Sequence, residues 1–240
     1  MAGNRSQNMS GPARRGRILA RPGLPEGAAQ DTGAPPGIHR LDLDSTRDGL
    51  CYVPAGYRSD TPAPLVLLLH GAGGNARNGL APLQPLADAA GLILLAPDSR
   101  RATWDVIQGG YGPDIAFIDA ALAATFARYA VDPVHLGIGG FSDGASYALS
   151  VGLTNGDLFT HILAFSPGFL AAAGQTGTPR IFISHGIHDS VLPIDRCSRR
   201  IVPRLRDADY AVRYKEFDGP HTVPPDIARA AVQWFTPVAA

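Results

Sequence analysis

Three scarcities in this sequence each argue against a class of protein. Cys51 and Cys197 are its two cysteines among 240 residues, which is too few for a disulfide framework and favours a reduced compartment. Basic and acidic residues balance at 21 each, and no stripe of basic residues carries interleaved aromatics, so a nucleic-acid partner is not expected. No apolar segment approaches the length of a membrane span. We therefore expect a soluble protein.

The first 36 residues differ in composition from the rest. Residues 1–36 are rich in Gly, Pro, Arg and Ser, which predicts a disordered or loosely docked arm before one domain over residues 37–240. The arginines of this arm are interpreted as part of a solvated tail, because the run is short and not amphipathic. The arm has no apolar core of the signal-peptide kind, so we expect a cytoplasmic protein; Met9 is an alternative start to Met1.

Strand-like and helix-like segments alternate from residue 38 onward. Alternating apolar and polar residues predict antiparallel strands at 38–43 and 49–53. Further strands, the most apolar of them buried on both faces, are predicted at 65–69, 92–96, 134–138, 161–165, 181–184 and 212–217. Helices are predicted at about 80–90, after a cap at Asp114, and at 143–154, 194–205 and 225–235. This alternation is typical of an α/β fold with a mostly parallel central sheet flanked by helices on both faces.

Ser142 stands between two glycines after the 134–138 strand. Gly140, Ser142 and Gly144 form the Gly-x-Ser-x-Gly pattern, in which a serine sits on a tight strand-to-helix turn. Glycines are expected at both flanking positions because side chains there would clash with neighbouring backbone. The pentapeptide alone is weak evidence in a chain with 28 glycines, so its catalytic partners must be found elsewhere.

A glycine-rich segment, His70-Gly71-Ala72-Gly73-Gly74, follows the 65–69 strand. The carboxyl ends of parallel strands gather at one edge of a sheet, so the amides of this segment can face Ser142. We predict that the amides of Ala72 and Asp143 form an oxyanion hole. A phosphate-binding loop is the alternative interpretation, but the segment lacks the Gly-Lys-Ser/Thr of such loops.

Asp189 and His221 follow the last two predicted strands and supply a candidate acid and base. With Ser142 before them they complete the chain order serine, acid, histidine. Asp218 is a rival acid, ranked behind Asp189 because it is too close to His221 in sequence to orient the far ring nitrogen comfortably. His185, His188 and Asp189 can also be read as metal ligands, but no further ligand is placed to complete the site, so we predict neither metal nor cofactor. His185 is expected to bond the loop backbone.

Together these segments resemble the α/β-hydrolases, in the branch of small serine carboxylesterases, phospholipase/carboxylesterases and polyhydroxybutyrate-depolymerase-like enzymes. The resemblance extends from about residue 37 to the C-terminus. It implies an α/β-hydrolase fold and hydrolysis of carboxylic esters by Ser142, His221 and Asp189 through an acyl-enzyme intermediate. The sequence departs from secreted depolymerases in showing no export signal and no polymer-binding domain.

The interval between Ser142 and Asp189 leaves no room for a sizeable cap domain, so we expect an open cleft that takes small or exposed acyl esters. Trp104, Phe169 and His188 are predicted to lie along this cleft, although ordinary packing explains the two aromatics equally well. An acyl thioesterase and an intracellular polyester-oligomer hydrolase are alternatives with the same triad. A non-catalytic binding module is disfavoured because all three triad residues are present. The oligomeric state is left open, with a homodimer among the possibilities.

Overall fold

The computed structural model describes residues 11–23 and 35–236, and an eight-stranded sheet runs through its centre. The strand order is β1-β2-β4-β3-β5-β6-β7-β8. The strands are β1 (Gly37–Arg40), β2 (Gly49–Val53), β3 (Ala63–Leu69), β4 (Ile93–Pro97), β5 (Val131–Phe141), β6 (His161–Phe165), β7 (Arg180–Gly186) and β8 (Val212–Phe217). Only the β1–β2 and β2–β4 pairs of this described sheet are antiparallel. The prediction of a mostly parallel sheet is therefore confirmed.

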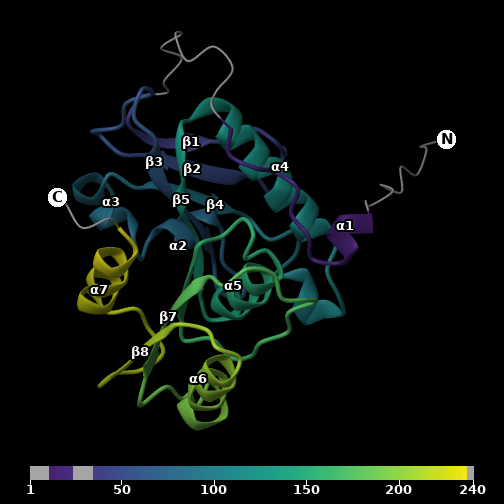
Figure 1. Cartoon of the computed structure of the whole chain (residues 1–240), viewed down its shortest axis with the longest axis vertical. Helices are drawn as coiled ribbons and strands as arrows, with labels where there is room; N and C mark the ends of the chain where they lie inside the picture. Colours follow the sequence, from purple (N-terminus) through teal and green to yellow (C-terminus); the bar gives the residue numbers. More distant parts are fainter. Residues whose placement is uncertain (1–10, 24–34, 237–240) are drawn as a thin grey trace.

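Helices cover both faces of the sheet, as predicted (Figure 1). On one face lie α1 (Gly11–Arg14), α4 (Pro113–Arg128), α5 (Asp143–Thr154) and α6 (Ser198–Asp207). On the other lie α2 (Ala76–Leu80), α3 (Gln84–Ala90) and α7 (Pro225–Phe235). Two short 3-10 helices, η1 (Asp105–Gln108) and η2 (Ile194–Arg196), lie in the connections. The apolar strands between these layers are buried on both sides, because each face of the sheet has its own hydrophobic core.

Three predicted helices differ from the observed ones. The helix expected at 194–205 is the 3-10 helix η2 followed by α6. The helix expected at about 80–90 is two helices, α2 and α3, separated by a turn that contains Pro82. Pro82 has no amide hydrogen to donate to a carbonyl of the preceding turn, so the helical hydrogen-bond series is interrupted there. Asp114 does not cap α4, which begins at Pro113; its carboxylate instead accepts hydrogen bonds from the amides of Arg100 (2.5 Å) and Asp105 (2.7 Å).

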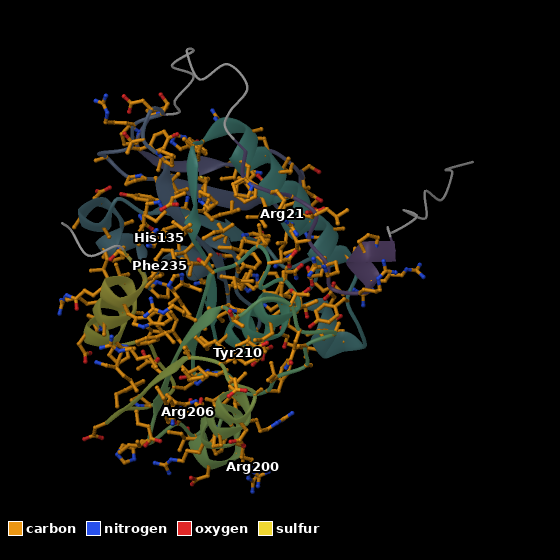
Figure 2. All side chains as sticks on the ribbon, viewed as in Figure 1. Arg21, His135, Arg200, Arg206, Tyr210 and Phe235 are labelled. Carbon is orange, nitrogen blue, oxygen red and sulfur yellow. The ribbon has the colours of Figure 1, made fainter. Side chains whose placement is uncertain are left out.

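The strand that carries Ser142 is held closely from the α7 side. Figure 2 labels His135 on β5 and Phe235 on α7, whose rings pack edge to face with centroids 6.3 Å apart. Gly137 allows this approach, because a Cβ there would lie 3.1 Å from the Phe235 ring. Phe235 thus packs against the central strand at His135 and Gly137, before the strand reaches the turn at its carboxyl end.

Residues 11–23 pack closely against the domain, in contrast to the disordered or loosely docked arm that composition suggested. The Ile18 side chain is fully buried, and its amide donates to Oδ1 of Asn155, which is also fully buried. Arg17 makes a two-fold contact with the Asp157 carboxylate, at 2.9 and 2.8 Å. Residues 1–10 and 24–34 of the predicted arm lie outside the described residues. None of the helices within the described ranges is long and apolar enough to cross a membrane.

Candidate active site

Ser142 lies on a sharp turn between β5 and α5 and has a backbone conformation that is unusual for a residue with a side chain. Its φ is 59° and its ψ is −121°. Such a conformation is strained in non-glycine residues and persists only where the surroundings enforce it. A Cβ on Gly140 would lie 2.5 Å from the carbonyl of Gly144, and a Cβ on Gly144 would lie 2.1 Å from the carbonyl oxygen of Leu69. The two flanking glycines are therefore required by backbone packing.

The structure brings Ser142, His221 and Asp189 into one hydrogen-bonded chain. Nε2 of His221 lies 2.9 Å from Oγ of Ser142, and Nδ1 of the same ring lies 2.5 Å from Oδ2 of Asp189. The Asp189 side chain is fully buried and that of His221 is 14% exposed. Because Nδ1 faces a carboxylate, its proton stays on Nδ1 and Nε2 is free to accept the serine proton.

Asp189 is held as a carboxylate by several donors. Its Oδ1 accepts hydrogen bonds from the amides of Val191 (2.9 Å) and Leu192 (2.7 Å). Burial by itself raises the pKa of Asp189, but the Leu192 amide and the His221 imidazole favour the charged form and bring the pKa below its ordinary value. The acid therefore stays ionised at neutral pH, which is the state that fixes the imidazole tautomer.

The glycine-rich segment after β3 lies next to the serine. A Cβ on Gly71 would touch Cβ of Ser142 at 3.4 Å. Gly73 has a φ of 69° and donates its amide to the carbonyl of Ala102 at 2.7 Å, which fixes the turn. Within the described part of the chain, the amides of Ala72 and Asp143 have no hydrogen-bond acceptor. Free amides beside a serine hydroxyl are the groups that an oxyanion hole needs.

Trp104 does not line the cleft, contrary to the expectation from sequence. Its side chain is fully buried, and Nε1 donates to the carbonyl of His70 at 2.9 Å. The ring stacks on Tyr147 of α5 with centroids 5.1 Å apart. Trp104 therefore supports His70, the first residue of the glycine-rich segment, and it has no surface left for a substrate.

Thr103 contacts the residue that follows Ser142, and the sequence carried no sign of this contact. Its hydroxyl donates to the carboxylate of Asp143 at 2.7 Å. This contact places the loop after β4 beside the first residue of α5. No local pattern could have revealed it, because the two residues belong to different strand-to-helix connections and meet only in the folded chain.

The other residues singled out in the sequence occupy both buried and exposed positions. His185 is buried and its Nε2 lies 2.8 Å from the carbonyl oxygen of Leu192, which agrees with the predicted bond to the loop backbone. Burial lowers the pKa of His185, so its ring is neutral. His188 is exposed and pairs with exposed Asp218 at 2.9 Å, whereas the carboxylate that contacts His221 is that of Asp189. Phe169 is half-buried in the loop after β6.

A cleft of about 600 Å³ opens beside the triad. Small and apolar residues supply most of its lining, which consists of Gly71, Ala72, Gly73, Gly74, Asn78, Ala81, Pro82, Phe141, His221, Thr222 and Val223. Between α5 and β7 the chain contains β6 and connecting loops without a helical insertion, and all of those residues are described. The cleft is therefore open, as expected from the short interval between Ser142 and Asp189.

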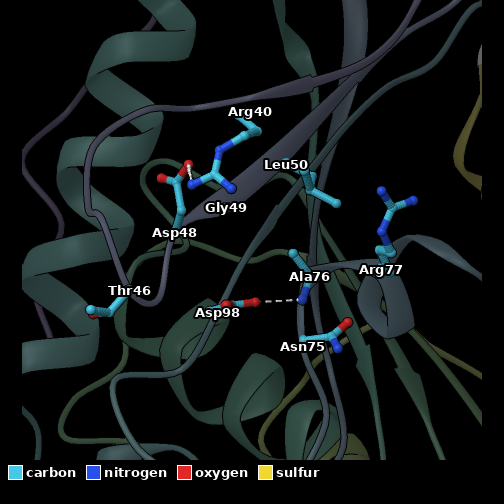
Figure 3. Close-up of a pocket in the computed structure, with 9 residues that line it drawn as sticks. All are labelled: Arg40, Thr46, Asp48, Gly49, Leu50, Asn75, Ala76, Arg77 and Asp98. Atoms are coloured by element: carbon cyan, nitrogen blue, oxygen red, sulfur yellow. Dashed lines mark hydrogen bonds and ion pairs between the residues drawn. The ribbon is translucent and has the colours of Figure 1, made fainter.

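A second, smaller pocket is lined by residues of β1, β2 and the start of α2 (Figure 3). It measures about 220 Å³, and its charged lining residues are Arg40, Asp48, Arg77 and Asp98. Asp98 accepts a hydrogen bond from the amide of Ala76 at 2.6 Å, which secures the start of α2. No triad residue lines this pocket, so it is distinct from the cleft beside Ser142.

Comparison with known proteins gives relatives among esterases. No protein-family model matches the chain. Feruloyl esterase C of Emericella nidulans is 30% identical over 157 residues, which cover 62% of this chain and 57% of that protein. Esterase PE8 superposes with a TM-score of 0.64 at 26% identity, over 79% of this chain and 98% of its own. A CE1 ferulic acid esterase from Anaeromyces mucronatus superposes with a TM-score of 0.62 at 18% identity, over 87% and 92%.

The sheet topology, the turn at Ser142 and these superpositions define the class: the chain has the α/β-hydrolase fold. Within that class it is related to serine esterases, in agreement with the resemblance seen in its motifs. The matched region spans no more than 60% of the length of the curated relatives.

Proposed function

We propose that the protein hydrolyses carboxylic esters through an acyl-enzyme intermediate. The observation that carries this proposal is the unbroken hydrogen-bonded chain from Oγ of Ser142 through His221 to the buried carboxylate of Asp189. A serine hydroxyl is a weak nucleophile by itself and needs an adjacent base that is oriented by a third group. These three side chains supply that arrangement.

His221 takes the hydroxyl proton through Nε2 as Oγ of Ser142 attacks the ester carbonyl. Asp189 holds the imidazole and stabilises its positive charge. The amides of Ala72 and Asp143 stabilise the oxyanion of the tetrahedral intermediate, and His221 returns the proton to the leaving alcohol. Water then attacks the acyl-enzyme, activated by the same imidazole, and frees the acid and the serine.

The substrates that we propose are small or exposed acyl esters, with compact aromatic acyl groups as the first candidates. The cleft beside His221 is open, and Phe141 and Val223 supply apolar surface on which an aromatic ring can pack. Relatives named feruloyl esterase add support for aromatic acyl groups. Both free cysteines are buried and unpaired, which is compatible with the cytoplasmic location expected from sequence.

The test is labelling with a fluorophosphonate, followed by mass-spectrometric mapping of the modified residue. In the parent protein we expect modification of Ser142. Ser142→Ala should abolish the labelling and lower kcat/KM for esters by roughly 10⁵-fold or more. Ser190→Ala is the matched control, because that serine is exposed in the loop after Asp189 and lies outside the hydrogen-bonded chain. Ester turnover by Ser142→Ala within a few-fold of the parent would overturn the proposal.

A substrate panel then separates esters from the alternatives. Nitrophenyl esters of increasing acyl length, methyl ferulate, acyl-CoA thioesters and soluble hydroxyalkanoate oligomers are compared by kcat/KM. Higher values for the small esters and methyl ferulate are expected. Preference for acyl-CoA would identify a thioesterase, and preference for the oligomers a polyester-oligomer hydrolase.

A further inference from the structure

Helix α5 carries a row of hydroxyl side chains behind the nucleophile. Ser146, Ser150 and Thr154 follow Ser142 at intervals of four residues, and all three are buried. Each hydroxyl donates to the carbonyl four residues earlier, at 3.2, 2.7 and 2.8 Å respectively. Residues four apart lie on one face of a helix, so the three hydroxyls form a continuous row that begins at the catalytic turn.

The same hydroxyls accept hydrogen bonds from the loop after β6. Ser146 accepts from the amide of Gly168 at 2.9 Å, Ser150 from that of Ala171 at 2.9 Å, and Thr154 from that of Ala173 at 3.2 Å. The loop backbone is therefore held in register along α5. Serine and threonine hydroxyls often bond to a helix carbonyl without further consequence. In this protein each of these hydroxyls also accepts a hydrogen bond from an amide of the loop after β6, so each one contacts that loop as well as its own helix.

Ser146 accepts from the amides of Gly168 and, at 3.4 Å, Phe169. It differs from the other two hydroxyls because its donor bond ends on the Ser142 turn and Gly168 lies next to the loop that carries Asp189. Its donor bond ends on the carbonyl of Ser142, which also accepts from the amides of Ala145 (3.0 Å) and Ser146 (3.1 Å). Its acceptor bond holds Gly168, where a Cβ would lie 3.1 Å from the Leu192 side chain. The amide of Leu192 donates to Asp189. One hydroxyl thus connects the nucleophile turn to the loop that carries the acid.

We propose that Ser146 is a positioning residue that sets the distance between Ser142 and the Asp189–His221 pair, through the Ser142 carbonyl on one side and the Gly168–Leu192 contact on the other. This inference rests on the proposed ester hydrolysis. The strained backbone of Ser142 needs surroundings that enforce it, and the Ser146 hydroxyl is one of three donors to its carbonyl, beside the amides of Ala145 and Ser146. A displacement of the reacting groups by about 1 Å can lower a rate by roughly 100-fold, so a modest relaxation here is measurable.

The experiment compares Ser146→Ala with Ser150→Ala. Each change removes a buried hydroxyl that joins a helix carbonyl to a loop amide at 2.9 Å, so comparable losses of thermal stability are expected. Only Ser146→Ala should slow fluorophosphonate labelling of Ser142 and lower kcat for an acetyl ester, each by roughly tenfold or more. KM should change by less than about threefold, because the acyl pocket is not removed.

A double-mutant cycle with Leu192→Ala tests the connection through Gly168. Leu192→Ala keeps the backbone amide that bonds Asp189 but removes the side chain that touches Gly168. In the Leu192→Ala background, the fold-decrease in kcat caused by Ser146→Ala should be smaller by a factor of roughly three or more. The connection from Ser146 through Gly168 to Leu192 is already lost there.

Three results would overturn the inference: equal kinetic losses in Ser146→Ala and Ser150→Ala, a kcat of Ser146→Ala within about twofold of the parent, or strict additivity with Leu192→Ala. A parent protein that does not react at Ser142 would instead refute the proposed function, and the inference with it.

Discussion

Two places in this molecule join segments that lie far apart in the sequence, and they differ in whether their polar groups all have hydrogen-bond partners. At the carboxyl edge of the sheet, Ser142, His221 and Asp189 meet beside an open cleft. Behind the end of α5, residues 11–23 meet Asn155 and Asp157.

The contact between residues 11–23 and the end of α5 satisfies the polar groups that it buries. The Asn155 side chain accepts from the amide of Ile18 at 2.9 Å and donates to the carbonyl of Gly16 at 2.7 Å. At the first contact, the amides of Ala72 and Asp143 have no acceptor among the described residues. Ala72 is exposed and Asp143 is half-buried, so both amides are free to bind a reacting group that enters the cleft. By contrast, the contact behind α5, in which the Asn155 side chain is hydrogen-bonded, contributes to stability.

The largest expected effect distinguishes Asp189, the proposed acid of the triad, from Asp218, the rival candidate. Asp189→Asn should lower kcat/KM by roughly 10⁴-fold, because an amide can favour the wrong imidazole tautomer and cannot stabilise its charge. Asp218→Asn is the matched control and should stay within about threefold, since Asp218 is exposed and pairs with His188. Steady-state ester hydrolysis measures both. A comparable loss in the two variants would contradict the assignment of Asp189.

Gly144→Ala should destabilise the catalytic corner strongly. The new Cβ would lie 2.1 Å from the carbonyl oxygen of Leu69 and 2.5 Å from that of His70, and backbone cannot yield as a side chain can. We expect the free energy of unfolding to fall by about 3 kcal/mol or more, measured by urea denaturation. Gly174→Ala is the control, because no atom lies within 4 Å of a Cβ there. Equal stability of the two variants would show that the turn is not constrained by packing.

Ile18→Ala addresses the contact behind α5. The side chain is fully buried, so its truncation should cost about 2 kcal/mol, at the low end for isoleucine because a segment near the chain terminus can collapse into the gap. The kcat/KM for esters should not change. Leu19→Ala, at a position 59% exposed, should have little effect on the melting temperature. Loss of activity in Ile18→Ala at full folding would mean that the two contacts are coupled.

The smallest effect depends on pH. Hydrogen bonds from Arg17 are the largest cause that lowers the pKa of Asp157 below 3.8, so this carboxylate stabilises the fold above that value and its contribution is lost as the pH falls. Because the Asp157 side chain is 39% exposed, solvent screens the pair, and Asp157→Asn should cost about 1 kcal/mol near neutral pH.

Thermal melts of the parent and of Asp157→Asn at about pH 7 and about pH 3 test this. The difference in melting temperature between the two proteins should be smaller at the lower pH. Asp60→Asn is the control, since Asp60 and its partner Arg58 are both largely exposed and should leave the melting temperature unchanged. A difference that widens in acid would contradict the assigned role of Asp157.

The parallel sheet and its candidate site could be predicted because both depend on local patterns. Unbroken apolar segments mark strands buried on both faces, and the segments that follow such strands must meet at one edge. Ser142, Asp189 and His221 could therefore be proposed as neighbours before their distances were known. Their chemical roles stay predictions for the experiments above.

Only the tertiary structure decided which side chains are buried and what they contact. Trp104 and Phe169 both follow strands and have the same aromatic character, yet Trp104 is fully buried under His70 whereas Phe169 is half-buried in its loop. Likewise, Arg17 meets Asp157 across 140 residues of sequence, although composition alone indicated a solvated tail. Periodicity reports which face of an element is apolar, but the partner of a given side chain depends on how the elements pack together, and that information is not local.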